Sequence, residues 1–208
     1  MRGLFIVIEG LDGSGKSTEA RLLARWMRRR GIDVILTREP GGTRVGRALR
    51  RMLLAGPPLD SLSELLLYLA DRREHVRQVI EPALRAGRSV ISERFCASTA
   101  AYQGYGRGLD LGLIDRLNKQ AVGRLRPDLT MVLDLPPDKA QTRLTNKHRD
   151  RLESQGPEFH RRVAKGYRAL ARKSRDVCIV PASGTRQEVF ARVKQMVEDL
   201  IERRGGVR

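Results

Sequence analysis

Gly10-Leu-Asp-Gly-Ser-Gly-Lys-Ser17 is the stretch of this sequence that decides the fold. It matches the pattern G-x-x-x-x-G-K-[ST] and stands between an apolar run over residues 4–8 and an amphipathic segment over residues 16–30. The pattern needs this strand–turn–helix setting, because its glycines turn backbone N–H groups toward a phosphate at the positive end of the helix. The stretch therefore predicts a site for a nucleoside triphosphate.

The residue types in this loop predict their roles. Lys16 is expected on the β- and γ-phosphates, and the Ser17 hydroxyl on Mg²⁺. We expect the whole loop to contact the triphosphate, namely Gly10, Leu11, Asp12, Gly13, Ser14, Gly15, Lys16, Ser17 and Thr18.

Outward from the loop, short apolar runs alternate with longer amphipathic stretches. The runs over residues 4–8, 34–37, 89–92, 129–135 and 177–180 are nearly continuous, which is typical of strands covered on both faces. Helical patterns occupy residues 16–30, 44–54, 61–86, 109–124, 137–146, 157–174 and 186–203. The alternation predicts an α/β fold of three layers, with a parallel sheet of about five strands and helices on both faces.

The domain organisation is simple. A chain of 208 residues fits one compact domain, here residues 1–208, because nothing in the composition marks a linker. The polar stretch over residues 146–156 interrupts the alternation and is predicted to be a short mobile lid. Gly31, Gly56 and Gly87 stand where helix C-caps are expected, and Ser61 with Glu64 predicts a capping box.

The charge of the chain has several interpretations. Lys and Arg number 41 against 24 Asp and Glu, so the net charge is +17. Solvated, arginine-rich helix faces account for such a balance, and a phosphate-rich small substrate would use part of it. A nucleic-acid surface is disfavoured, because only 4% of the residues are aromatic and could stack on bases.

Composition also bears on the cellular compartment. No apolar run approaches the ~18 residues of a membrane-spanning helix, and the start of the chain does not resemble a signal peptide. The two cysteines, Cys96 and Cys178, lack metal-like spacing and fit a reducing compartment. We therefore expect a cytoplasmic protein without a membrane partner.

The use of the triphosphate must be inferred from other segments. GTPases read guanine with an N-K-x-D segment after a strand, whereas Asn146-Lys147-His148-Arg149 lacks the Asp and that setting. A minimal domain with many arginines indicates a small phosphoryl-transfer kinase, because two phosphate-bearing substrates need a cluster of cations to hold them together.

Further segments carry a resemblance to a known family. They are Thr37-Arg-Glu-Pro-Gly-Gly-Thr43, Glu93-Arg94-Phe95, Ser98-Thr-Ala-Ala-Tyr-Gln-Gly104 and Arg126-Pro-Asp-Leu-Thr-Met-Val-Leu-Asp134. Together with the P-loop, they resemble the bacterial thymidylate kinases from about Phe5 to the final helix. The resemblance implies transfer of the γ-phosphoryl group of ATP to dTMP, with Mg²⁺, in a homodimer. The alternatives are another nucleoside monophosphate kinase, a nucleoside kinase, or a P-loop ATPase that binds nucleic acid.

The same resemblance implies roles for the acceptor site. Arg94 would clamp the 5′-phosphate, a bidentate task that suits arginine. Tyr102 would crowd the sugar 2′ position, and Thr99 and Gln103 would hydrogen-bond the pyrimidine ring. The other substrate-binding residues that the family pattern implies are Glu39, Pro40 and Ser98.

For the thymine ring, the resemblance implies an aromatic residue that stacks on it and an arginine that reaches its O4. Tyr68 and Arg72 lie four apart and hence on one helix face, so they match this pair. Leu67 and Arg73 offer alternative registers.

Catalytic residues are implied for the loop and the lid. Asp12 resembles the family carboxylate that contacts the acceptor. Some members carry an arginine in the P-loop and others in the lid; here the P-loop has none, whereas the lid carries Lys147, Arg149 and Arg151. Arg149 and Arg151 are therefore expected to close over the transferred phosphoryl group, where negative charge develops.

One departure from the family concerns the metal. The family usually has Asp where this chain has Glu93, whose carboxylate is one methylene longer and is predicted to help hold Mg²⁺ with Ser17. Arg143 and the turn over residues 181–183 correspond to the region that holds adenine.

Overall fold

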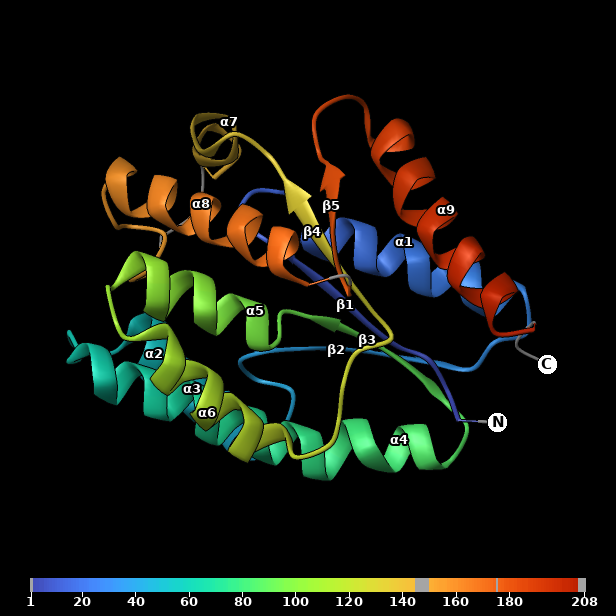
Figure 1. Cartoon of the computed structure of the whole chain (residues 1–208), viewed down its shortest axis with the longest axis horizontal. Coiled ribbons are helices and arrows are strands. Elements are labelled where there is room, and N and C mark those ends of the chain that lie inside the picture. Colours follow the sequence, from blue (N-terminus) through green and yellow to red (C-terminus); the bar gives the residue numbers. More distant parts are fainter. Residues whose placement is uncertain (1, 145–149, 175, 206–208) are drawn as a thin grey trace.

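The computed structural model describes residues 2–144, 150–174 and 176–205. Its centre is one parallel sheet in the order β2-β3-β1-β4-β5 (Figure 1). The strands are β1 (Phe5–Gly10), β2 (Val34–Arg38), β3 (Ser89–Glu93), β4 (Leu129–Asp134) and β5 (Val177–Pro181). The predicted parallel sheet is confirmed, and the P-loop follows the central strand.

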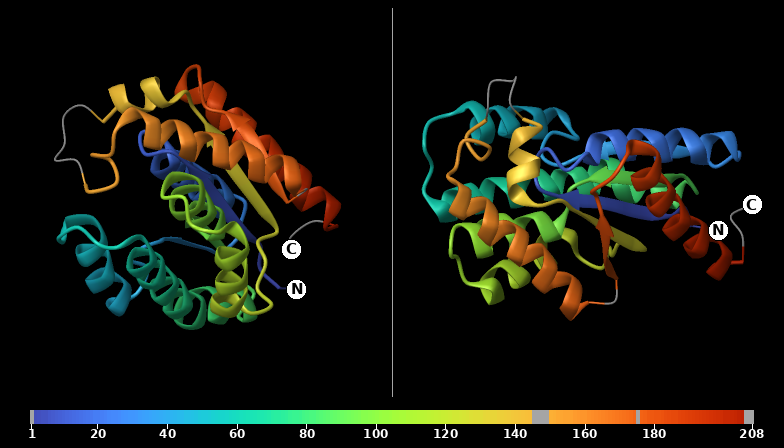
Figure 2. Two further views of the ribbon diagram at one scale, coloured as in Figure 1. Left: turned by 60° about the vertical axis from the view of Figure 1, so that its left-hand side comes forward. Right: turned by 90° about the horizontal axis from the view of Figure 1, so that it is seen from above.

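The helices cover both faces of this sheet. They are α1 (Lys16–Arg29), α2 (Arg44–Ala55), α3 (Ser61–His75), η1 (Val76–Ile80), α4 (Glu81–Arg85), α5 (Cys96–Thr99), η2 (Ala100–Gly106), α6 (Leu111–Val122), α7 (Pro137–Thr142), α8 (Pro157–Lys173) and α9 (Arg186–Arg203). Among these, α1 and α9 pack on the face of Ile6 and Ile8, while α3, α4 and α6 pack on the face of Phe5 and Val7 (Figure 2). The predicted three-layer α/β fold is confirmed.

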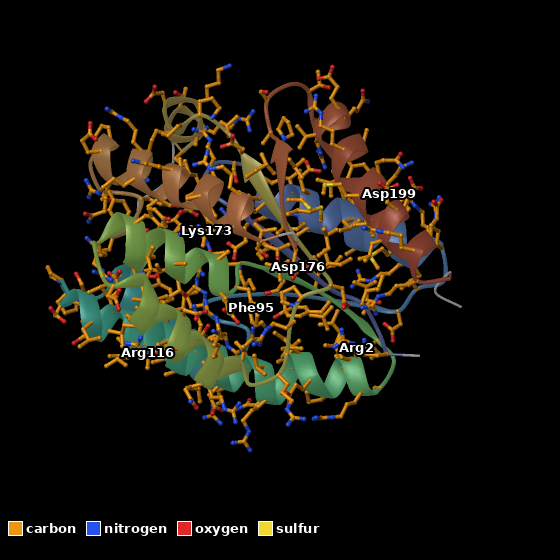
Figure 3. The ribbon with its side chains drawn as sticks, in the orientation of Figure 1. Arg2, Phe95, Arg116, Lys173, Asp176 and Asp199 are labelled. Atoms are coloured by element: carbon orange, nitrogen blue, oxygen red, sulfur yellow. The ribbon has the colours of Figure 1, made fainter. Side chains whose placement is uncertain are left out.

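Charged side chains lie on the outer surfaces of these layers. Arg116 of α6 and Asp199 of α9 are exposed at opposite sides of the molecule, whereas Phe95 is buried between the layers (Figure 3). In the part of the chain that the structure describes, none of the helices combines the length and the apolar character needed to cross a bilayer.

Two helical segments differ from the prediction. The helix expected over residues 61–86 contains the wider π turn η1 shortly before Pro82, whose missing N–H and ring disturb a regular α-helical ladder. The pair α5 and η2, residues 96–106, was not predicted. A Cβ on Gly104 would lie 2.4 Å from Leu111 and one on Gly106 2.6 Å from Phe159, so this helix depends on close tertiary packing that sequence periodicity does not reveal.

The predicted helix caps are correct in part. Gly31 and Gly87 follow the ends of their helices with left-handed φ values of 76° and 78°, and Gly56 is the C-cap of α2 in an extended conformation. The capping box expected at Ser61 and Glu64 is wrong. Asp60 caps α3 instead, because its side chain accepts hydrogen bonds from the N–H groups of residues 62 and 63 at 2.8 and 3.2 Å.

This assignment can be checked by substitution. Asp60→Ala removes the acceptor for two helix N–H groups, so we expect the free energy of unfolding to fall by about 1 kcal/mol. Ser61→Ala removes no cap and should change it by much less. Urea denaturation of both variants measures the difference, and a larger effect at residue 61 would contradict the assignment.

Candidate active site

The P-loop has the geometry that its sequence predicts. β1 ends at Gly10, and α1 begins at Lys16. Gly10, Gly13 and Gly15 have φ values of 137°, 82° and 100°, a region that L side chains rarely adopt. A Cβ on Gly13 would also lie 2.2 Å from the Ala140 carbonyl oxygen. Glycine is therefore required here for backbone conformation and for space.

Lys16 lies inside this loop. Its Nζ donates hydrogen bonds to the carbonyl oxygens of Gly10 at 3.0 Å and Leu11 at 2.7 Å, and it lies 3.5 Å from an Asp12 carboxylate oxygen. Burial and, to a smaller extent, the nearby Arg94 guanidinium lower the pKa of Lys16 to about 8, while Asp12 opposes the shift. Anionic phosphate oxygens would stabilise the ammonium form at this position.

A cleft of about 640 Å³ opens over the loop. Its walls include Arg143 of the segment after α7 and Gly184 of the turn before α9. The cleft is also lined by most of the loop, namely Gly13, Ser14, Gly15, Lys16, Ser17 and Thr18. The structure therefore brings together the predicted triphosphate and adenine regions. Gly10 and Leu11 do not line the cleft; their carbonyl groups hold Lys16 instead.

Ser17 and Glu93 meet at the base of this cleft. The Ser17 hydroxyl donates to a Glu93 carboxylate oxygen at 2.5 Å, although Ser17 lies in the first turn of α1 and Glu93 at the end of β3. These are hard oxygen ligands, and Mg²⁺ binds with few protein ligands when phosphates supply the others. The described residues contain no cluster of three or more acidic, histidine or cysteine side chains that would form an all-protein metal site. The donor set fits Mg²⁺ bound with a nucleotide.

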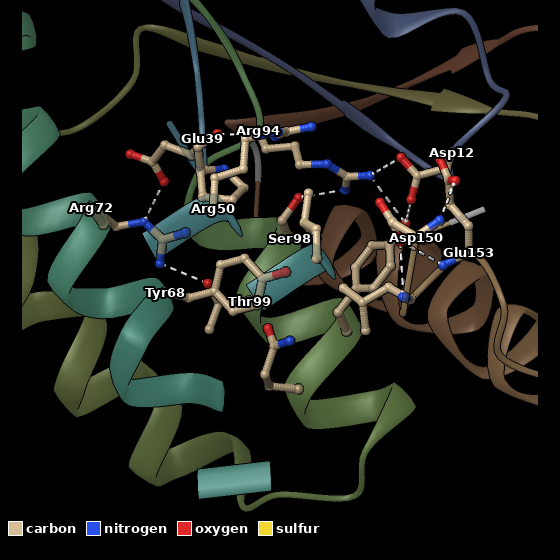
Figure 4. Close-up of a pocket in the computed structure, with 15 residues that line it drawn as sticks. Asp12, Glu39, Arg50, Tyr68, Arg72, Arg94, Ser98, Thr99, Asp150 and Glu153 are labelled. Atoms are coloured by element: carbon tan, nitrogen blue, oxygen red, sulfur yellow. Dashed lines mark hydrogen bonds and ion pairs between the residues drawn. The ribbon is translucent and has the colours of Figure 1, made fainter. Parts of the chain in front are cut away.

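A second, narrower cavity of about 100 Å³ adjoins the cleft (Figure 4). Every residue predicted to bind the acceptor lines it: Glu39, Pro40, Tyr68, Arg72, Arg94, Ser98, Thr99, Tyr102 and Gln103. The structure thus brings together side chains from α3, α5 and η2 and from the segments that follow β2 and β3. Asp12, Glu39, Arg50, Arg94 and Glu153 line both spaces, so the two spaces meet there.

Arg94 stands at this meeting point in a strained conformation. Its φ of 71° is the one positive φ of a non-glycine residue in the described chain. The guanidinium pairs with Asp12 and donates to Ser98 Oγ at 3.1 Å and to the Tyr102 hydroxyl at 3.3 Å. Burial opposes ionisation of Asp12, but Arg94 and Lys16 outweigh it and hold the pKa of that carboxyl well below its usual range. The site therefore keeps an ionised Asp12 and a fixed cation at the boundary.

Glu9 holds the segment that follows Arg94 and was not predicted as a site residue. It is fully buried and accepts from Phe95 N at 2.8 Å, Ser98 N at 3.1 Å, Ser98 Oγ at 2.5 Å and the Tyr167 hydroxyl at 3.0 Å. Burial raises the pKa of Glu9, which the hydrogen bonds and Arg94 partly oppose. An acidic residue at the end of an otherwise apolar buried strand was the signal available in the sequence.

Arg72 is held in one orientation by the protein. Its Nε donates to Glu39 at 2.8 Å, Nη1 to Thr99 at 2.7 Å and to Asn118 at 2.5 Å, and Nη2 to the Phe95 carbonyl oxygen at 3.0 Å. These bonds use all but one of the five N–H groups of a guanidinium. Arg72 is therefore a fixed part of the cavity wall, with one Nη2 hydrogen left for a ligand.

The register of α3 agrees with the chosen pair. Tyr68 and Arg72 both line the narrow cavity, whereas Leu67 does not. The Arg73 guanidinium donates to the Ala121 carbonyl oxygen at 3.2 Å on α6, on a different side of the helix. The alternatives through Leu67 and Arg73 thus lie outside the cavity lining.

The structure does not bring Arg151 to the P-loop. Its Nη2 forms an ion pair with Glu64 at 2.6 Å, and its Nε donates to the Leu53 carbonyl oxygen at 3.0 Å. Arg151 is thus attached to α2 and α3, because a buried carboxylate there needs a cation, and its predicted position over the phosphoryl group is not seen. Lys147 and Arg149 lie outside the described residues.

Other residues of the site were missed by sequence reasoning. Arg50 lines both spaces, and its Nη1 donates to the Pro40 carbonyl oxygen at 3.0 Å. Asp150 and Glu153, from the segment before α8, also line the narrow cavity. Arg50 is one of many arginines in α2, so no pattern distinguished it from its solvated neighbours.

The burial of Glu9 predicts a pH-dependent stability. Its pKa is raised in the folded state, so the folded protein binds this proton more tightly and wild-type stability falls as the pH rises through that pKa. Glu9→Gln removes the group. We expect the free energy of unfolding of Glu9→Gln, relative to wild type, to increase with pH across this range in denaturation measured at several pH values. Parallel profiles would contradict a raised pKa.

Comparisons with known proteins agree with this geometry. The sequence model of the thymidylate kinase family matches residues 8–193. Thymidylate kinase of Synechococcus sp. (strain JA-2-3B'a(2-13)) is 51% identical over 196 residues, 94% of each chain. That of Desulfovibrio desulfuricans (strain ATCC 27774 / DSM 6949 / MB) is 44% identical over 213 residues, covering 97% of this chain and 98% of the relative. The crystal structure of thymidylate kinase from Ehrlichia chaffeensis matches with a TM-score of 0.78 at 38% identity, covering 95% of this chain and 99% of that one. The chain belongs to the thymidylate kinase family.

Proposed function

We propose that this chain transfers the γ-phosphoryl group of ATP to dTMP, forming dTDP and ADP. The observation that carries the proposal is the meeting of the P-loop cleft and the narrow cavity at Asp12, Arg50 and Arg94. A donor in the cleft and an acceptor in the cavity would place their phosphates side by side at this boundary. Family membership supports the same reaction.

On the donor side, the loop amides and Lys16 would hold the β- and γ-phosphates. Ser17 and Glu93 would hold Mg²⁺, which would supply positive charge to the phosphate groups. Arg143 and the turn near Gly184 would surround the adenine. These groups fix the donor, and none of them forms a covalent bond with it.

On the acceptor side, Arg94 and Arg50 would bind the 5′-phosphate of dTMP at the boundary of the two spaces. Phosphoryl transfer needs little covalent chemistry from the protein, so catalysis depends on in-line positioning and charge neutralisation. The Tyr102 hydroxyl donates to Asp12 at 3.0 Å, which holds the ring beside the expected sugar. This ring would leave room for deoxyribose and exclude a 2′-hydroxyl.

The test is ADP release with Mg-ATP against dTMP, dUMP, UMP, dCMP, dAMP, dGMP and no acceptor. We expect strong release with dTMP, weaker release with dUMP and none with UMP. Tyr102→Ala should relax the discrimination between dUMP and UMP, because it opens the space beside the sugar.

Other outcomes of this assay would contradict the proposal in distinct ways. Turnover with another monophosphate would retain the kinase mechanism but reject the pyrimidine contacts. Hydrolysis indifferent to any acceptor would leave only an ATPase, and DNA binding that weakens steeply with salt would then favour a nucleic-acid-binding protein.

We also propose that the chain is a homodimer that pairs through α2 and α3. Helices α2 and α3 pack together, yet both expose large apolar side chains. On α2 these are Val45 (47% exposed) and Met52 (52%), and on α3 they are Leu62 (43%) and Leu66 (50%). Exposed large apolar side chains on two helices that pack together favour a protein–protein contact, and a second copy of this chain would cover them.

Light scattering coupled to gel filtration tests the dimer. We expect wild type at twice the mass of one chain and Leu66→Glu at the mass of a single chain, because a charge in the contact would remain unpaired. Ile179→Glu is the matched control, since Ile179 lies on β5 and is exposed outside this face. A monomeric wild type would reject the dimer.

A cytoplasmic location remains a prediction from the sequence.

A further inference from the structure

Glu64 is a buried carboxylate for which the reaction described above has no use. It lies in the first turn of α3 and is fully buried. Its Oε1 accepts from Gln103 Nε2 at 2.8 Å, and its Oε2 pairs with Arg107 at 3.1 Å and with Arg151 at 2.6 Å. These partners come from η2, from the residue after it, and from the segment before α8. One carboxylate thus connects α3, η2 and the segment before α8, each of which contributes residues to the lining of the narrow cavity.

This arrangement decides the orientation of the Gln103 amide. Glu64 forms ion pairs with two guanidinium groups, and a carboxylate only accepts hydrogen bonds. The amide must therefore turn its NH₂ toward Glu64, which leaves its carbonyl oxygen on the other side. No described donor reaches that oxygen, and Gln103 lines the narrow cavity. The Gln103 side-chain carbonyl oxygen is consequently available to the cavity as a hydrogen-bond acceptor.

The neighbouring polar groups of the cavity are donors. Thr99 Oγ1 accepts from Arg72 Nη1 at 2.7 Å, so its own proton is available to a ligand. Arg72 retains one N–H on Nη2 and has no acceptor atom. At these three lining residues, Thr99 and Arg72 therefore offer donors and Gln103 offers an acceptor. Thymine presents O4 and O2 as acceptors on either side of the N3–H donor, whereas cytosine has an unprotonated N3.

We propose that Glu64 is a specificity-determining positioning residue, which selects a base with a protonated N3 by holding the Gln103 carbonyl oxygen toward the cavity. This inference rests on the proposed placement of the dTMP base in the narrow cavity. Glu64 touches no substrate and acts through Gln103. Arg107 and Arg151 make the arrangement possible, because a buried carboxylate without cations would be strongly destabilising.

The experiment is steady-state kinetics of wild type and Glu64→Gln with dTMP, dUMP and dCMP. In Glu64→Gln, residue 64 can donate as well as accept, so the Gln103 amide is free to turn over. We expect the ratio of kcat/KM for dTMP over dCMP to fall about tenfold, because one hydrogen bond no longer discriminates N3. Part of the selectivity remains, since Arg72 still faces the base with an N–H.

The ratio for dTMP over dUMP serves as an internal control. These two bases share the same N3–H and differ only by a methyl group, so Glu64→Gln should leave this ratio unchanged. Arg107→Lys is the matched control variant: it weakens the ion pair but keeps the bond between Glu64 and Gln103. We expect Arg107→Lys to lower the melting temperature without changing either ratio.

Glu64→Asp provides a second route if Glu64→Gln does not fold. It keeps the charge that Arg107 and Arg151 need, but it withdraws the carboxylate from Gln103 by one methylene, and the dTMP to dCMP ratio should again fall. The inference would be overturned if the dTMP to dCMP ratio stayed unchanged in a folded variant. It would also be overturned if the dTMP to dUMP ratio fell together with it. A wild type that does not use dTMP would instead reject the proposed function.

Discussion

The hydrogen bonds from the backbone of Phe95 and Ser98 to the buried Glu9 carboxylate are the interaction on which the rest of the site depends. They attach the segment after β3 to the end of β1, directly before the P-loop. Arg94 directly precedes these anchors, with φ at 71°, and lies where the P-loop cleft and the narrow cavity meet. A strained backbone persists only where its surroundings over-determine it, and Glu9 supplies that constraint.

Throughout the site, each of the following buried charged side chains is paired with a side chain of opposite charge. Arg94 is paired with Asp12, Arg72 with Glu39, and Glu64 with two arginines. Each pair avoids an isolated buried ion, and each fixes the hydrogen-bonding direction of a neighbour. The excess of positive charge in the sequence therefore has two destinations: a few arginines are locked into the site, and many others are solvated on the helix faces.

The sequence predicted the fold and most of the cavity lining for clear reasons. Buried parallel strands are continuous apolar runs, and the P-loop pattern places one strand before one helix, so the sheet and its central site follow from local signals. The residues proposed for the acceptor site were found through resemblance, because Arg94 and Tyr102 are close only after folding. Helix α5–η2 was missed, since its small residues form a helix through packing of Gly104 and Gly106 against other elements.

The sequence by itself determined the α/β class, the position of the triphosphate loop and the family. Only the tertiary structure decided that Arg151 pairs with Glu64, that Arg50 lines both spaces and that Glu9 supports Arg94. The physical reason is that local patterns report which side chains are apolar, flexible or turn-forming. A charged residue acquires its partner only when segments far apart in the chain come together, and burial then makes that partner obligatory.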